Sequence, residues 1–189
     1  MNKQIAMCCL SAALLPGYLA AGEPAQVAEA QSAIATFAGA LKAELTSAMQ
    51  AGGPLAAIEV CKARAPAIAA SVSNESGMNL LRVSLRNRNP DNAPNEWQTP
   101  VLQTFETRLA AGEAPANLSW HQTAEKDGRE EFRFMKAIPT GTVCLTCHGE
   151  AIAPPVAAKI DELYPADKAT GFREGELRGA FVVTKTLER

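Results

Sequence analysis

The residues with the clearest chemistry lie in the segment CLTCH at positions 144–148. Two thiols separated by two residues and followed directly by an imidazole form the C-x-x-C-H pattern that attaches c-type haem. The thiols form thioethers with the two vinyl groups at one edge of the porphyrin, and the imidazole places a nitrogen beneath the iron. The pattern therefore predicts one covalently attached haem c, with Cys144 and Cys147 as attachment sites and His148 as an axial ligand.

Other chemistries use the same residue types. A disulfide between Cys144 and Cys147 would close a very small loop and stabilise the fold little. A thioredoxin-like redox motif normally lies next to a βαβ unit, for which the sequence gives no pattern. A Cys3His zinc site formed by Cys61, Cys144, Cys147 and His148 satisfies the ligand count of structural zinc. The full five-residue pattern favours haem, and a zinc-binding structural module remains an alternative.

The second axial position of a haem iron can hold water, histidine, methionine or a thiolate. The candidates are Cys61, His121, Met78 and Met135. Cys61 could instead be a small buried apolar residue, as cysteine often is. As a thiolate ligand it would lower the reduction potential relative to His/Met ligation. Spacing alone leaves Cys61, His121 and an open site as alternatives.

The N-terminus has the three parts of a secretory signal peptide, which we assign to residues 1–22. Lys3 supplies a positive charge, Ile5 to Leu15 is apolar, and small residues surround Ala21. The apolar run is shorter than the roughly 20 residues that span a bilayer, so an uncleaved anchor is the weaker alternative. We expect a periplasmic protein without membrane attachment after cleavage.

Length and charge limit the remaining possibilities. The chain has 189 residues, 18 basic and 20 acidic, for a net charge of -2. Nucleic-acid binding needs a clustered basic excess, so it is not expected here. With hydrophobic residues at 47%, the chain can build one globular core, and residues 23–189 are expected to form one domain.

The order of predicted elements indicates an α+β fold. Helical patterns come first and strands joined by short turns follow, which favours an antiparallel sheet over a parallel one. Asp127-Gly128 is a hairpin signal between two of the strands. The expected helices cover residues 25–50, 54–72, 94–109 and 156–163, and the expected strands cover residues 80–85, 118–123, 131–138 and 179–186.

Several segments together resemble a family of small bacterial c-type haem proteins, catalogued largely as a domain of unknown function. They are AIEVCKARAP at 57–66, RVSLRNRNPDNAPNEW at 82–97, FRFM at 132–135, YPADKATGF at 164–172 and GELRGA at 175–180, together with the haem motif. Relatives occur as secreted monohaem proteins and as sensor segments of membrane signalling proteins. The resemblance implies a PAS-like antiparallel sheet flanked by N-terminal helices. It also implies His/Cys axial ligation, with Cys61 at the position of the cysteine ligand.

The expected function is electron transfer, or redox or diatomic-gas sensing, with a separate redox or signalling partner protein. With two protein ligands the iron has no open position, so an enzyme is not favoured. The enzyme alternative is a peroxidase-like protein with an open distal site, in which His121 or Glu131 would act as acid or base.

Three arginines and three aromatic residues also have predicted positions or roles. Arg88 is expected to be solvated in a polar loop, while Arg86 and Arg133 are undecided between such a role and pairing with a haem propionate. Trp97 and Trp120 are expected in the core. Phe132 stands where many relatives of the resembled family have Tyr.

Overall fold

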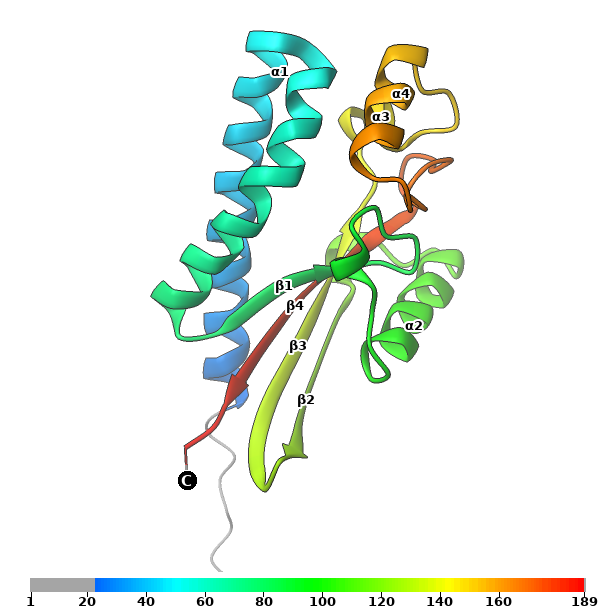
Figure 1. Cartoon of the computed structure of the whole chain (residues 1–189). Coiled ribbons are helices and arrows are strands. Elements are labelled where there is room, and N and C mark those ends of the chain that lie inside the picture. Colours follow the sequence, from blue (N-terminus) through cyan, green and yellow to red (C-terminus); the bar gives the residue numbers. More distant parts are fainter. Residues whose placement is uncertain (1–22, 189) are drawn as a thin grey trace, which may run out of the picture.

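The computed structural model describes residues 23–188, and the predicted signal peptide at residues 1–22 lies outside them. The described chain is α+β, with a long N-terminal helix followed by an antiparallel sheet and further helices (Figure 1). The helices are α1 (Glu23–Ser76), α2 (Gln98–Ala110), α3 (Leu145–His148) and α4 (Pro154–Leu163), with 3-10 turns η1 (Pro90–Asn92), η2 (Pro115–Asn117) and η3 (Thr142–Cys144). The strands are β1 (Asn79–Val83), β2 (Ser119–Lys126), β3 (Arg129–Pro139) and β4 (Leu177–Thr186). This confirms the predicted fold class. Within residues 23–188, no helix has the length and apolar character needed to cross a membrane.

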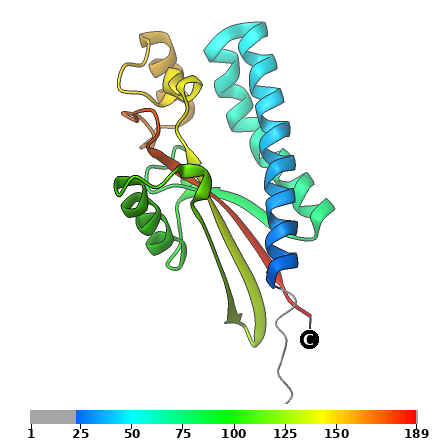
Figure 2. The same cartoon turned by 180° about the vertical axis from the view of Figure 1, so that it is seen from behind.

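Helix α1 is bent back on itself at Gly53. Gly53 has φ 67°, a conformation that glycine adopts without steric cost, and Pro54 then suits the first turn of the next helical segment. The first arm (residues 23–52) and the second arm (residues 54–76) therefore lie side by side in opposite directions (Figures 1 and 2). An ion pair of 2.8 Å between Glu44 and Arg64 joins them. The predicted break between two helices is thus confirmed.

The sheet has the order β1-β4-β3-β2, and every neighbouring pair is antiparallel. Asp127 and Gly128 link β2 to β3 with φ of 54° and 74°. Positive φ at both positions is the requirement of a two-residue type I′ hairpin turn. The hairpin predicted at this dipeptide is confirmed.

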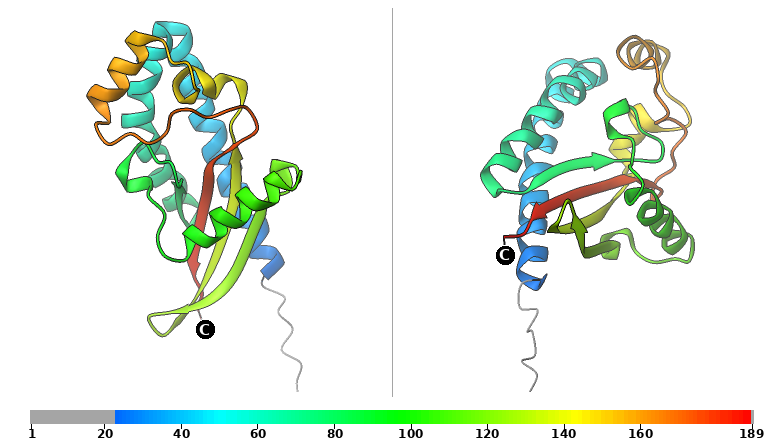
Figure 3. Two further views of the ribbon diagram at one scale, coloured as in Figure 1. Left: turned by 90° about the vertical axis from the view of Figure 1, so that its right-hand side faces the viewer. Right: turned by 60° about the horizontal axis from the view of Figure 1, so that its bottom comes forward.

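Helices α1 and α2 pack on opposite faces of the sheet (Figure 3). Phe37 of α1 packs with Phe134 on one face, and Phe105 of α2 packs with Met135 on the other. Trp97 and Trp120 stack at 5.7 Å and pack against the α2 core, as predicted. The sheet is therefore the central layer of three.

At Gly179 the ends of β4 and β1 come unusually close together. A Cβ atom at this position would lie 2.3 Å from the carbonyl oxygen of Val83. That oxygen belongs to the backbone of the neighbouring strand, so it cannot rotate away as a flexible side chain could. Glycine is therefore required here by space.

Candidate functional site

The haem motif and Cys61 come from opposite parts of the chain and meet where α1 docks on α4. The motif forms η3 and α3, which follow directly from β3. An apolar cluster joins Ile58 of the second arm to Ile160 and Tyr164 of the α4 region, and Cys147 packs against it. Glu59 and Lys159 add an ion pair of 2.9 Å between the same two helices. The contact holds the second arm of α1 next to α4 and Cys147, and Cys61 lies on that arm three residues after Ile58. Figure 1 shows this arm and the α3–α4 region at the same end of the molecule.

The three described cysteines, Cys61, Cys144 and Cys147, are free thiols, each half-buried. Burial raises the pKa of Cys61, and the neighbouring Cys144 raises it further. Burial also raises the pKa of Cys147, with additional contributions from Cys61 and Cys144. Cys147 packs against the cluster that contains Ile58, three residues before Cys61, and Cys144 caps the short helix α3 that carries Cys147, so the three thiols lie in one region. The structure therefore brings together the three cysteines that the sequence analysis singled out.

His148 is held as a neutral imidazole with a defined proton position. Its Nδ1 lies 2.7 Å from the carbonyl oxygen of Ala169. A carbonyl only accepts, so Nδ1 carries the proton and Nε2 keeps its lone pair. Burial lowers the pKa of His148 to about 2, and the positive charges of Arg178 and Arg88 contribute. A neutral histidine with Nδ1–H bonded to a carbonyl is the usual arrangement of a metal-ligating imidazole.

Arg88 is part of the site, so the prediction that it is solvated in a loop is wrong. Its side chain is 9% exposed and pairs at 3.1 Å with Asp167, which is 7% exposed. Its Nη2 also donates to the carbonyl oxygens of Cys147 at 2.6 Å and Ala169 at 3.2 Å. The loop turns inward here because these partners satisfy a buried guanidinium.

Positive charge is in excess around the site. Half-buried Arg82 and Arg178 influence Cys61 together with buried Arg88, and all three lower its pKa. Burial and repulsion from Arg88 and Arg82 lower the pKa of Arg178 to about 10. Within the described residues, neither Arg82 nor Arg178 has an ion pair, and the buried Nε of Arg88 has no hydrogen-bond partner. The site is therefore suited to negatively charged groups.

Arg82, Arg178 and Asp167 lie in the segments that carry the family resemblance, but the sequence predicted no role for them at the site. A signal for Arg82 exists, because it is a charged residue within the otherwise apolar strand NLLRV. Arg178 is the second residue of the largely buried strand β4, and Asp167 pairs with a residue far away in the sequence. Only the folded chain shows that these residues surround Cys61 and His148.

The other candidate iron ligands lie elsewhere. His121 is exposed on β2, an edge strand of the sheet. Met78 and Met135 are 1% and 0% exposed, in the cores on the two faces of the sheet. Glu131, considered as an acid or base, is paired with Lys126 and Arg133 near the hairpin. Of the candidates for the second axial position, the structure brings Cys61 to the motif.

The two undecided arginines differ. The Arg86 guanidinium lies 3.8 Å from the ring centroid of Phe172, whose ring meets that of His148 edge-on at 6.3 Å. Arg86 also donates to the carbonyl oxygen of Thr170. Arg133 lies over Trp97 at 5.0 Å, on the α2 side of the sheet. Arg86 is thus a neighbour of the site, and Arg133 is not.

The zinc alternative requires three or four ligands in one coordination sphere. In the part of the chain that the structure describes, no three His, Cys, Asp or Glu side chains are arranged to hold a metal ion. The thiols and the imidazole share a site without forming such a group. The arrangement does not support a Cys3His zinc centre.

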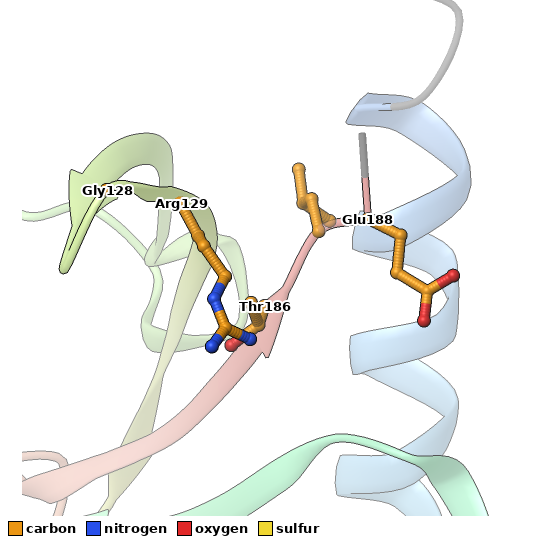
Figure 4. A pocket seen from close by; sticks show the side chains of 5 residues that line it. Gly128, Arg129, Thr186 and Glu188 are labelled. Carbon is orange, nitrogen blue, oxygen red and sulfur yellow. The ribbon is translucent and has the colours of Figure 1, made fainter.

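A surface hollow lies at the opposite end of the sheet, between the hairpin and the end of β4 (Figure 4). Its lining residues are Gly128, Arg129, Thr186, Leu187 and Glu188. None of them is a thiol or an imidazole. The candidate chemistry is confined to the end of the sheet where α3 and α4 lie.

Comparisons with known proteins agree with this picture. The crystal structure of the cyanobacterial heme-protein Tll0287 is similar, with a TM-score of 0.66 and 25% sequence identity, over 88% of this chain and 98% of that chain. No curated protein matches the chain. The family model described as Tll0287-like matches residues 21–185. The chain belongs to the Tll0287-like family.

Proposed function

We propose that the chain binds one haem c covalently through Cys144 and Cys147, with His148 and Cys61 as axial iron ligands. The observation that carries this proposal is the packing of the second arm of α1, which carries Cys61, against the cluster that Cys147 of the CLTCH segment contacts. The similarity to a cyanobacterial heme-protein supports the same cofactor. Bound haem would supply an iron that takes up and releases one electron.

The residues present fit such a group. The Nε2 lone pair of His148 is available because Nδ1 donates to Ala169. Burial opposes ionisation of Cys61, while the positive charges of Arg82, Arg88 and Arg178 favour its thiolate form. The unpartnered Nε of Arg88 and the excess of guanidinium groups also suit the negative carboxylates of haem.

Two protein ligands leave no open iron position, so we propose electron transfer as the principal function. Redox or diatomic-gas sensing is the related possibility, in which Cys61 leaves the iron and the change reaches a partner protein. In either case residues 1–22 would direct export to the periplasm, where the thioethers are formed. His121 is exposed on the edge strand β2, away from the motif, so it does not support the peroxidase-like alternative as a distal acid or base.

The decisive experiment is export of the wild type and Cys61→Ala from a host with haem-maturation machinery. After denaturation and extraction with acidified organic solvent, we expect the pigment to stay with the polypeptide in both. We expect a low-spin ferric thiolate signature by EPR in the wild type and its loss in Cys61→Ala, with His121→Ala as the matched control. Extractable pigment would refute covalent attachment, and an unchanged EPR spectrum in Cys61→Ala would refute thiolate ligation.

Carbon monoxide separates the two functions. If Cys61 stays bound after reduction, both axial positions remain filled by protein ligands, and the ferrous protein will show no Soret shift with carbon monoxide. A shifted band would mean that Cys61 is displaced, which would favour sensing. The same addition to Cys61→Ala should give the shift in either case and serves as the positive control.

A further inference from the structure

The carbonyl group that accepts the hydrogen bond of His148 also contacts a buried ion pair between Arg88 and Asp167. The carbonyl oxygen of Ala169 accepts from His148 Nδ1 at 2.7 Å and from Arg88 Nη2 at 3.2 Å. The N–H of Ala169 donates to Asp167 Oδ1 at 2.8 Å, and the other carboxylate oxygen, Oδ2, pairs with Arg88 at 3.1 Å. Arg88, Asp167 and the Ala169 backbone thus form a closed ring whose shared acceptor holds the imidazole.

The same guanidinium also fixes the residue before the histidine. Arg88 Nη2 donates to the carbonyl oxygen of Cys147 at 2.6 Å. On the other side, the N–H of Phe172 donates to the carbonyl oxygen of His148 at 2.8 Å. The imidazole is therefore positioned through its ring nitrogen and through the backbone on both sides.

The shared acceptor has an electronic consequence. A cation that donates to the Ala169 carbonyl makes that oxygen a poorer acceptor for Nδ1–H. The imidazole then keeps less negative character and donates less electron density through Nε2 to a bound metal. The Asp167 carboxylate counteracts this effect by partly neutralising the guanidinium. Because both side chains are buried, solvent screens neither of them strongly.

We propose that Arg88 and Asp167 are positioning residues that set the reduction potential through His148, with Arg88 raising it and Asp167 lowering it. The inference rests on the proposed function, because it requires iron bound to His148. It assigns opposite signs to the two members of one ion pair. A purely structural role does not do so, because removal of either member would disturb the same site in the same way.

The test is a spectroelectrochemical titration of the haem-loaded wild type, Arg88→Met and Asp167→Asn, with dithionite as reductant and ferricyanide as oxidant. We expect the equilibrium constant for reduction to fall about tenfold in Arg88→Met and to rise about tenfold in Asp167→Asn. For one electron, tenfold corresponds to about 59 mV. Arg88→Lys keeps the positive charge, so its reduction potential should lie closer to that of the wild type than the potential of Arg88→Met does. Shifts in the same direction, or no shift, would refute the inference.

Controls separate this result from the proposed function. Arg173 forms an exposed ion pair with Glu150 at 2.9 Å, so Arg173→Met removes the same charge near the motif and should leave the potential unchanged. If Arg88→Met does not fold, Asp167→Asn decides alone, because an unchanged or lowered potential contradicts the inference. A wild type without covalent haem would instead refute the proposed function.

Discussion

The two ends of the sheet differ in how their charged side chains are paired. At the hairpin end, Glu131 is paired with Lys126 at 3.1 Å and with Arg133 at 2.9 Å, and the lysine is 57% exposed. At the α3 end, Arg88 is paired with Asp167, while Arg82 and Arg178 have no ion pair among the described residues. Unbalanced charge away from water is costly, so its presence marks a site where function outweighs stability.

The two histidines show the same contrast. His121 lies exposed on the edge strand β2, whereas His148 is held by Ala169 and surrounded by guanidinium groups. Their residue type is the same, but His148 follows the C-x-x-C pair and has a half-buried, hydrogen-bonded position, whereas His121 has neither. The following changes test this difference, from the largest expected effect to the smallest.

Exchanging each histidine for alanine should give the largest contrast. His148→Ala should abolish the low-spin spectrum of the haem-loaded protein, because the iron would lose the ligand that Ala169 orients. His121→Ala should leave the spectrum unchanged. Absorption and EPR spectra of the two exported variants provide the measurement, and equal spectra would contradict the assignment of the site.

The two ion pairs should differ in their contribution to stability. In the apoprotein, Arg88→Met should lower the free energy of unfolding by about 3–5 kcal/mol, because it leaves the Asp167 carboxylate buried without its partner. Lys126→Ala should cost about 0–1 kcal/mol, because that lysine is largely exposed. Urea denaturation checks both values. Arg88→Met combined with Asp167→Leu should recover part of the loss, and a similar cost for both single changes would contradict the comparison.

Acid should destabilise the apoprotein through His148. Its pKa falls from 6.5 to about 2 on folding, so the unfolded chain binds this proton more readily. The contribution to stability is therefore complete above pH 6.5 and is lost as the pH falls towards 2, by about 1.4 kcal/mol per pH unit. Urea titrations between these limits should show a shallower pH dependence for His148→Asn and the wild-type dependence for His121→Asn. Equal slopes for all three proteins would exclude this role.

The bend that brings Cys61 to the site should respond to a single methyl group. Gly53→Ala places a Cβ at φ 67° and should lower stability by about 1–2 kcal/mol. Gly39→Ala, at an open helical position of the same helix, should raise it by about 0.5–1 kcal/mol. Thermal unfolding monitored by circular dichroism distinguishes the two. A stabilising Gly53→Ala would mean that the bend does not depend on glycine.

The sequence predicted most elements because their signals are local. Asp127-Gly128 specifies its own turn, and Gly53 followed by Pro54 specifies the bend. Boundaries shifted where side chains intervene. The helix expected from Pro94 begins at Gln98, after a turn in which the backbone N–H groups of Asn95 and Gln98 donate to each other's side-chain oxygens at 2.9 and 3.1 Å.

The site was predictable only in part. The CLTCH spacing identifies a haem motif without any knowledge of the fold. The role of Arg88 was not predictable, because its partners Asp167, Ala169 and Cys147 follow it by many residues and no periodicity links them. Burial of a charged side chain depends on such distant partners, so a polar loop sequence predicts solvent exposure by default.

The lack of space at Gly179 limits how this scaffold can be altered. Any side chain there would collide with the Val83 carbonyl and push the two strands apart, and Arg178 is the adjacent residue. A library randomised at this position should return glycine alone among folded clones. Efforts to graft a different cofactor environment onto the scaffold should therefore leave this position fixed and vary the arginines around it.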